Sequence, residues 1–228
     1  MTIHNIETVK QMIIRCQKLN KKQIMEAFCW MILGDGCIEV PLRGNCRLAI
    51  THAADHEDYL YWKASIIEQV TSFSINPQKG SGFSPSNGNY LRLRSSTHPW
   101  FTKVYKRFYA PLGRKSIDPH ALKLLGPLGL AILYQDDGSY HYSTNAGHNI
   151  LIHKLCFSKF ELEALAKAIV DKFGIIFRIN RDKGKGFGYR LRMRASDREK
   201  FFELINPYIV PSMLYKVGKG GTSSEVVI

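Results

Sequence analysis

Two segments of the chain are apolar on nearly every side of a helix, and both end in an acidic residue followed by glycine. Residues 25–33 read MEAFCWMIL and lead into GDG at 34–36, whereas residues 127–135 read PLGLAILYQ and lead into DDG at 136–138. A helix that is apolar all round is buried on several sides. The pattern therefore predicts two buried helices that pack on each other, each ending at an aspartate.

Other features recur at nearly the same distance along the chain. Asp35 and Asp137 are 137 − 35 = 102 positions apart, and the segments LRLRSS and LRMRAS start 191 − 91 = 100 positions apart. Lys115 and Lys216 are 216 − 115 = 101 positions apart. A period of about 100 residues is too long for a solenoid unit and matches a whole domain. We expect an N-terminal repeat over residues 1–115 and a C-terminal repeat over residues 116–228.

Each copy shows the same order of predicted elements, namely a helix, a strand pair, a second helix, a second strand pair and a final helix. The strands are marked by alternation with a period of two, and the helices by apolar residues three or four positions apart. We expect an α+β fold with helix caps at Asn20, Asp55, Thr97, Ser158 and Ser196. The predicted strands are 37–42, 46–51, 74–80 and 89–95 in the first copy, and 139–144, 149–157, 174–183 and 187–194 in the second.

The overall charge narrows the class of partner. A net charge of +13 and a pI near 9.6 favour a polyanion, because lysine and arginine neutralise phosphates and release counterions. The alternative is a basic protein with no such partner. The five cysteines form no CxxC pair and no metal-ligand spacing, which fits a reducing, intracellular compartment. The N-terminal residues lack the apolar core of a signal peptide, and no apolar run suggests a membrane span.

Basic side chains are concentrated on one face of the predicted strands. Residues 90–94 read YLRLR and residues 190–194 read RLRMR, so a period of two puts the arginines on one face and the apolar residues on the other. A solvated sheet face usually mixes charges, and a face this positive would repel itself without an anion. Arginine can bind phosphate or guanine in a bidentate way, asparagine can read adenine, and a two-stranded ribbon fits the major groove. The residues we expect to contact DNA are Arg43, Arg47, Lys79, Tyr90, Arg92, Arg94, Tyr140, Tyr142, Arg178, Asn180, Arg181, Lys183, Lys185, Tyr189, Arg190, Arg192 and Arg194.

Asp35 and Asp137 are the candidate metal ligands. A single Asp-Gly pair after a helix is usually a turn, but two pairs at matched positions of a repeat indicate a shared role. If the helices pack side by side, the two carboxylates meet at one end of the seam, where a divalent cation relieves their repulsion. Oxygen ligands suit Mg²⁺ or Mn²⁺, and such an ion beside a cationic sheet is typical of a phosphodiesterase that uses metal-assisted water attack.

Four further residues belong to this predicted site. Lys115 and Lys216 are candidates for stabilising charge on the phosphate or on the attacking water, although each lysine alone would be an ordinary surface residue. Gly34 and Asp136, which precede the two acids, are secondary candidates for the metal.

The windows FCWMILGDG (28–36) and LAILYQDDG (130–138) resemble the signature of the LAGLIDADG homing endonucleases, in their single-chain, two-repeat branch. The first window has Cys29 and Trp30 in place of the small residues that usually let the two helices approach, and Asp136 lies where the family has a small or variable residue. The resemblance extends from about Lys21 to Val217. It implies an αββαββα fold in each pseudo-symmetric repeat, with paired LAGLIDADG helices at the interface.

The same resemblance implies a saddle of two antiparallel sheets over a long, asymmetric double-stranded DNA target. It also implies cleavage of both strands across the minor groove, with 3′ overhangs, and an intron-homing role. Since one chain carries both acids, we expect a monomer that uses Mg²⁺, with Mn²⁺ as a substitute. By position in the signature, the metal-binding acids would be Asp35 and Asp137.

Two other functions fit parts of the pattern. An RNA maturase that assists intron splicing, which the same family also contains, would use the basic sheets on intron RNA. A non-catalytic DNA-binding protein on the same fold would be expected to have lost one or both acids. Only cleavage needs both, so the presence of Asp35 and Asp137 favours the endonuclease. The target sequence does not follow from the chain, because base preference depends on side-chain geometry, bound water and DNA bending together.

Overall fold

The computed structural model of the 228-residue chain describes residues 18–79, 89–109, 113–144, 147–153, 157–182 and 188–218. The first half contains α2 (Lys21–Leu33), β1 (Cys37–Glu39), β2 (Arg47–Ala53), α3 (Glu57–Glu68), β3 (Phe73–Lys79), β4 (Asn89–Ser95) and α4 (Pro99–Phe108). Helix α5 (Pro119–Leu124) leads into the second half, which contains α6 (Pro127–Asp137), β5 (Gly138–Ser143), β6 (Gly147–Ile152), α7 (Lys159–Phe173), β7 (Phe177–Asp182), β8 (Gly188–Met193) and α8 (Arg198–Ile205). Short 3-10 turns are η1 (Ala54–His56), η2 (Ala195–Asp197), η3 (Asn206–Tyr208) and η4 (Pro211–Val217).

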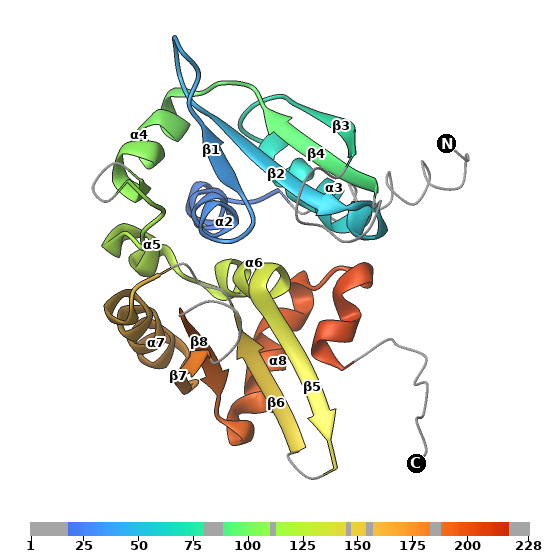
Figure 1. Ribbon diagram of the computed structural model, residues 1–228, viewed down its shortest axis with the longest axis vertical. Helices are drawn as coiled ribbons and strands as arrows, with labels where there is room; N and C mark the ends of the chain where they lie inside the picture. Colours follow the sequence, from blue (N-terminus) through green and yellow to red (C-terminus); the bar gives the residue numbers. More distant parts are fainter. Residues whose placement is uncertain are drawn as a thin grey trace.

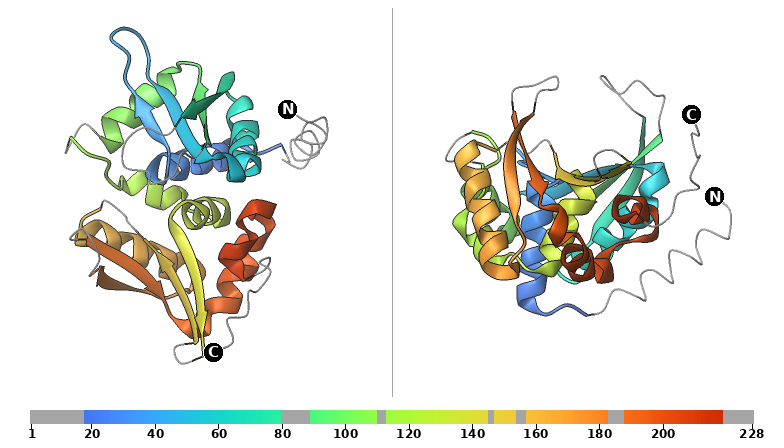
Figure 2. Two further views of the ribbon diagram at one scale, coloured as in Figure 1. Left: turned by 45° about the vertical axis from the view of Figure 1, so that its right-hand side comes forward. Right: turned by 90° about the horizontal axis from the view of Figure 1, so that it is seen from below.

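Each half builds its own antiparallel sheet, with the orders β1-β2-β4-β3 and β5-β6-β8-β7. The predicted α+β class and the order of elements are confirmed. Helices α3 and α4 pack against the first sheet and α7 against the second. The sheets diverge from the central helices, so that their other faces are turned to one common side of the molecule (Figures 1 and 2). We call these two uncovered faces the open face.

Helices α2 and α6 lie side by side between the two halves, as the apolar pattern predicts (Figure 1). Residues 26–33 of α2 and 128–135 of α6 are buried. The bulky Trp30 is fully buried, and the space for its indole is provided by Gly129 across the seam. A Cβ added to Gly129 would lie 2.3 Å from Trp30 Cδ1. The two motifs are therefore complementary, with a large residue in the first facing a glycine in the second.

The amino end of α6 is capped from the other half of the chain. Its N-cap residue, Gly126, has no side chain, and the Glu26 carboxylate of α2 accepts the N–H groups of Gly126 at 2.9 Å and of Gly129 at 2.5 Å. Burial raises the pKa of Glu26, and the hydrogen bonds from these two N–H groups only partly oppose it. A carboxylate at a helix amino end satisfies free N–H groups and complements the helix dipole. This contact adds a polar link to a mostly apolar seam.

Two of the five predicted helix caps are confirmed and three are wrong. Asn20 and Ser158 each form a capping box with the glutamine or glutamate three residues later. Asp55 and Ser196 lie inside the 3-10 turns η1 and η2, so α3 and α8 begin later than expected. His98 replaces Thr97 as the cap of α4, because its ring nitrogen accepts the N–H of Trp100. Among the residues that the structure describes, no helix is long and apolar enough to cross a membrane.

Candidate functional site

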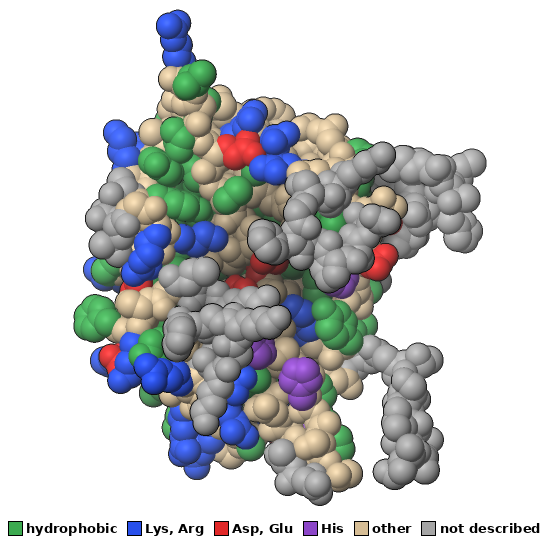
Figure 3. Space-filling view, viewed as in Figure 1, with side chains coloured by type: hydrophobic (Ala, Val, Ile, Leu, Met, Phe, Trp, Pro, Cys, Tyr) green, Lys and Arg blue, Asp and Glu red, His purple; other side chains and the backbone are tan. Residues whose placement is uncertain are grey.

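The carboxyl ends of α2 and α6 bring three aspartates together at one end of the seam, beside the open face. Asp35 follows the C-cap of α2, whereas Asp136 and Asp137 are the last two residues of α6. The N–H of Asp35 donates to the Asp136 carboxylate at 3.1 Å, which joins the two helix ends directly. Acidic side chains accordingly appear at the centre of this face, between two regions of basic side chains (Figure 3).

The electrostatics of Asp35 and Asp137 reflect this crowding. Burial is the largest cause that raises the pKa of Asp35 to about 6, and the Asp136 charge adds to it. Burial likewise raises the pKa of Asp137 to about 8, with contributions from Asp136 and Asp35. The nearby lysines only partly offset these effects. The side chain of Asp35 keeps 40% of its surface exposed, so at least this carboxylate is open to a ligand from solvent.

Asp136 has a different environment, because its side chain is completely buried in a network from the first half of the chain. The Lys63 ammonium lies 2.6 Å from Asp136 Oδ1, and both side chains have no exposed surface. The Tyr59 hydroxyl donates to the same oxygen at 2.8 Å. Burial alone would raise the pKa of Asp136, but Lys63, His52 and the Asp35 N–H together lower it below its usual value. Asp136 is therefore a charged partner inside the protein.

His52, on β2, lies between Lys63 and Asp35. Its Nε2 is 3.1 Å from Lys63 Nζ, and its Nδ1 is 3.8 Å from Asp35 Oδ2. Burial and the Lys63 charge lower the pKa of His52 to about 3, so the ring is neutral at physiological pH. One potential ligand atom from each of Asp35, His52 and Asp136 lies within 4.8 Å of the others.

Lys115 and Lys216 occupy corresponding places at the ends of the two central helices. Lys115 Nζ donates to the carbonyl oxygens of Gly34 at 2.7 Å and Gly36 at 2.9 Å. Lys216 Nζ donates to the carbonyl oxygens of Gln135 and Asp136. Burial lowers the pKa of both lysines, and the three aspartates oppose that shift. The structure thus places both predicted lysines beside the acids, where they hold the backbone of the helix ends.

The donor chemistry of this cluster fits a divalent cation that prefers oxygen. Two carboxylates with raised pKa values are crowded together, and the third is already paired with Lys63. A cation between Asp35 and Asp137 would relieve their repulsion. Since both oxygens of Asp136 have protein partners, Asp35 and Asp137 are the carboxylates suited to the ion.

The arginine row of the first half surrounds one acid that the sequence pattern did not single out. Glu39 accepts hydrogen bonds from Arg47 at 2.6 Å, from Arg92 at 2.5 Å and from Arg94 at 3.2 Å. Arg47 and Arg94 keep 42% and 41% of their side-chain surface exposed. The corresponding position in the second half is His141, at 39 + 102 = 141. The two basic regions therefore differ at this position, where the first has an acid and the second a histidine.

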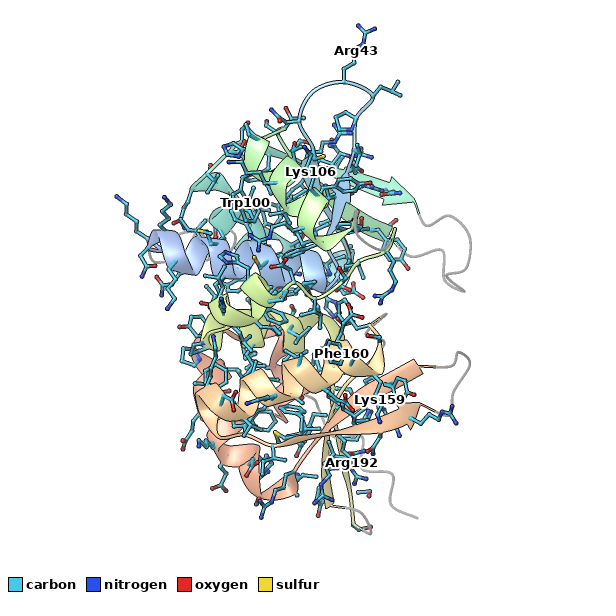
Figure 4. The ribbon with its side chains drawn as sticks, turned by 90° about the vertical axis from the view of Figure 1, so that its left-hand side faces the viewer. Arg43, Trp100, Lys106, Lys159, Phe160 and Arg192 are labelled. Carbon is cyan, nitrogen blue, oxygen red and sulfur yellow. The ribbon has the colours of Figure 1, made fainter. Side chains whose placement is uncertain are left out.

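The strand pairing separates the remaining predicted DNA contacts into two groups. In the second sheet, Arg178 pairs with Arg192 and Asn180 pairs with Arg190, on the face opposite Leu191. Arg43 lies in the exposed loop between β1 and β2 of the first half, far along the chain from Arg192 on the second sheet (Figure 4). Tyr140 and Tyr189 pack against the core. Arg181 pairs with Tyr189 on that same side of the sheet. These three were predicted for the DNA face, and the structure places them on the other side.

Five further predicted contacts lie at the strand ends or outside the described side chains. Tyr90 lies in β4 in the same alternation as Arg92 and Arg94, and Tyr142 is exposed at the far end of β5. Lys79 ends β3, and its side chain is outside the described part of the structure, as are Lys183 and Lys185.

Sequence reasoning missed Tyr59, His52 and Lys63. A signal was present for Lys63, which lies on the buried side of α3 with Leu60 and Ile67. A lysine at a core position of an amphipathic helix must have a charged partner, because an unpaired buried charge is costly. Its partner could not be identified from periodicity, since Asp136 is 136 − 63 = 73 positions away.

Comparison with known proteins places these features in a family. Residues 25–201 match the model of the LAGLIDADG DNA endonuclease family. A protein named RecA from Mycobacterium gastri is 29% identical over 88% of this chain and 48% of its own length, so this chain spans about half of that relative. The cytochrome b mRNA maturase bI2 of Debaryomyces hansenii is 25% identical over 90% of this chain and 78% of its own length.

Solved structures show the same fold. The homing endonuclease I-WcaI, bound to its DNA recognition sequence, is 23% identical, with a TM-score of 0.72 over 93% of both chains. I-DmoI in complex with DNA and Mn is 20% identical, with a TM-score of 0.51 over 84% of this chain and 100% of that one. The family match covers most of the chain, including both acidic motifs and both sheets. The chain belongs to the LAGLIDADG DNA endonuclease family.

Proposed function

We propose that this protein is a site-specific homing endonuclease that hydrolyses phosphodiester bonds in both strands of a double-stranded DNA target. The observation that carries the proposal is the position of Asp35 and Asp137, one from each half, at the ends of the paired helices and between two basic sheets. One chain holds both acids, so the active form is a monomer on one duplex. The products have 3′ overhangs, as the family resemblance implies.

The open face binds the target. Its arginines lie on strands that diverge from the seam, so that one row is directed to each side of the cleavage position. Arginine forms bidentate bonds with phosphate and guanine, which provides both affinity and base discrimination. Because Glu39 restrains the row of the first half, the two halves of the target are read by different chemistry.

Asp35 and Asp137 would hold Mg²⁺, with Mn²⁺ as a substitute. A bound ion of this kind polarises the phosphate and lowers the pKa of a water nucleophile. The carbonyl oxygens of Gly34 and Asp136, next to the two acids, are further candidate ligands, since a carbonyl oxygen that accepts one lysine N–H retains a second lone pair. The buried Asp136 carboxylate supports the site from behind.

Lys115 and Lys216 act on the site through the backbone and through their charge. Each ammonium ties down carbonyl oxygens at the end of one central helix, which orients the following acid. Each also offsets part of the negative charge of the aspartates. We assign them a supporting role in the chemical step.

Cleavage of a plasmid library that carries candidate insertion sites, with Mg²⁺ or with EDTA, tests the proposal. Sequencing of the cut ends should show one site class, 3′ overhangs, and no products in EDTA. Asp35→Asn and Asp137→Asn should each abolish double-strand cleavage and retain specific DNA binding in Ca²⁺. Asp171→Asn, which changes an exposed acid on α7, is the matched control. Double-strand cleavage by either active-site variant would contradict the assignment.

A maturase is the second candidate, because the match to the cytochrome b mRNA maturase spans most of both chains. The two functions separate in a splicing assay with the two aspartate variants. A maturase would promote splicing of its intron RNA without needing Asp35 or Asp137, whereas DNA cleavage requires both. Specific RNA binding with no DNA cleavage on any library would favour this candidate.

A further inference from the structure

A buried network of charged and polar groups contacts Asp35, one of the two candidate metal-binding acids. Lys63 has no exposed surface, and its ammonium contacts Asp136 Oδ1 at 2.6 Å and His52 Nε2 at 3.1 Å. It also lies 4.2 Å above the centre of the Tyr59 ring. Through Asp136 Oδ2 the network reaches the Asp35 N–H, and through His52 Nδ1 it approaches the Asp35 carboxylate. Asp35 is therefore contacted on both its backbone and its side chain.

The contact with Lys63 determines which nitrogen of His52 carries the proton. A lysine ammonium has three donors and no acceptor, so His52 Nε2 must accept. The neutral ring then carries its proton on Nδ1. That nitrogen is 3.8 Å from Asp35 Oδ2, so His52 presents an N–H to the carboxylate. With no free lone pair on Nδ1, the ring is a donor to a metal-binding acid and not itself a ligand.

Among the described residues of the second half, no buried lysine–aspartate pair of this kind is present, and the histidine beside Asp137, His153, has its ring nitrogen 2.7 Å from the Ser139 hydroxyl. The N-caps of α3 and α7, His56 and Ser158, align the two helices at 158 − 56 = 102 positions. By the same offset Lys63 corresponds to Leu165, at 165 − 63 = 102, which is fully buried. Asp136 corresponds to Gly34, at 136 − 34 = 102.

The residue that corresponds to Asp136 in the first half, Gly34, must be a glycine for steric reasons. A Cβ built on Gly34 would lie 2.1 Å from Asp136 Oδ2. The Asp136 carboxylate thus occupies the space that any side chain at position 34 would need. Positions 34 and 136 cannot both carry a side chain, so the carboxylate that pairs with Lys63 comes from α6 alone.

We propose that His52, Lys63 and Asp136 are positioning residues for Asp35 and that they make the two metal-binding acids inequivalent. Histidine or carboxylate partners behind a ligand fix its orientation, and their loss usually costs about 10- to 100-fold in metal affinity or activity. Only the measurements of DNA cleavage rest on the proposed nuclease function. Loss of the network should impair the Asp35 site and leave the Asp137 site nearly intact.

The first test is the tautomer of His52 in the unmodified protein, without DNA or metal. Two-bond ¹H–¹⁵N correlation spectra of ¹⁵N-histidine-labelled protein, assigned with His52→Gln, distinguish the two neutral forms. The expected result is a proton on Nδ1. A proton on Nε2, or a charged ring near neutral pH, would overturn the proposal. This result stands whether or not the protein cleaves DNA.

The second test compares the two acids directly. The double variant Lys63→Met/Asp136→Asn removes both buried charges together, which avoids an unpaired buried ion. His52→Gln removes the ring, and Leu165→Met is the matched control at the corresponding position of the second half. Thermal melts identify variants that remain folded, and Mn²⁺ titration followed by electron paramagnetic resonance counts the bound ions.

On a duplex labelled on both strands, the network variants should cut one strand about 10- to 100-fold more slowly. The other strand should be cut within about twofold of the wild-type rate, and one of the Mn²⁺ ions should bind more weakly. Leu165→Met should change neither the strand ratio nor Mn²⁺ binding. Equal slowing of both strands, or unchanged Mn²⁺ binding with unchanged strand rates, would show that the network has only a structural role. If no DNA is cleaved at all, the tautomer and Mn²⁺ binding still decide the question.

Discussion

Gly129 of α6 faces the indole of Trp30 in α2 so closely that a Cβ on Gly129 would lie 2.3 Å from Trp30 Cδ1. Glycine inside a helix is normally less favourable than alanine by about 1 kcal/mol. At this position the close approach of the two helices outweighs that preference. The first motif contributes a large ring where small residues are usual. The second motif makes room for that ring because glycine has no side chain.

Gly129→Ala should therefore destabilise the protein by about 1–3 kcal/mol, because a side chain forced into a packed core displaces its neighbours. Chemical denaturation measures the change in the free energy of unfolding. The cost should decrease in a Trp30→Phe background, since the two residues are in contact and their effects are coupled. An increase in stability from Gly129→Ala, as helix propensity alone predicts, would contradict this account of the seam.

Glu39→Gln should increase the affinity for DNA and the dependence of binding on salt. The carboxylate now accepts hydrogen bonds from Arg47, Arg92 and Arg94 and neutralises part of their charge. Removal of one negative charge near phosphate contacts should steepen the salt slope by up to about one. Binding to the target and to unrelated DNA across a salt series measures the effect. Glu199→Gln, on the exposed start of α8, is the control.

If Glu39 instead reads a base in the target, Glu39→Gln would weaken specific binding and leave nonspecific binding unchanged. The comparison of target and unrelated DNA separates these outcomes. In either case the change should be confined to the half of the target that the first sheet covers. An effect spread over both halves would contradict the placement of Glu39 in the first basic region.

Lys115→Met and Lys216→Met should each slow cleavage more than they weaken DNA binding. Each ammonium donates to carbonyl oxygens beside one acid, so its loss disturbs the orientation of that acid and leaves buried acceptors without a partner. We expect a loss of stability of about 1–3 kcal/mol in addition. Single-turnover cleavage at saturating enzyme and binding in Ca²⁺ measure the two effects separately. Wild-type cleavage rates in both variants would show that the two lysines do not contribute to the chemical step.

Glu161 should give the protein an acid-sensitive component of stability. Burial alone would raise its pKa, but hydrogen bonds from Arg114, Ser158 and the Ile117 N–H lower it to about 2. Because the pKa in the folded state is lower than in the unfolded state, this stabilisation is complete above about pH 4.5 and is lost as the pH falls towards 2. Since solvent partly screens the pair, we expect about 1–2 kcal/mol.

Thermal melts of wild type and Glu161→Gln between pH 2 and 7 measure this component. The difference in stability should be largest near neutral pH and should shrink as Glu161 becomes protonated. Glu163→Gln, an exposed neighbour paired with Lys159 at 3.5 Å, should show little difference at any pH. A constant difference between Glu161→Gln and wild type across this range would mean that its charge contributes nothing.

The sequence by itself determined the architecture and the two acids. Alternation with a period of two and the nearly uniform apolar character of residues 25–33 and 127–135 are local signals, so strands and central helices could be predicted from them. The offset of 102 positions between Asp35 and Asp137 predicted that the two acids share a role, and the structure places both at the ends of the central helices. Hydrophobic periodicity also predicted correctly which face of β4 and β8 carries the arginines.

Only the tertiary structure decided what surrounds those acids. Asp136 and Asp137 are adjacent in the chain, but their environments differ. Asp136 is paired with Lys63 and Tyr59, whereas Asp137 lies near the charges of Asp35 and Asp136, which raise its pKa. Such contacts join residues far apart in the sequence and depend on how two helices and two sheets are arranged. No local period encodes them, because burial and charge pairing are set by the assembled fold.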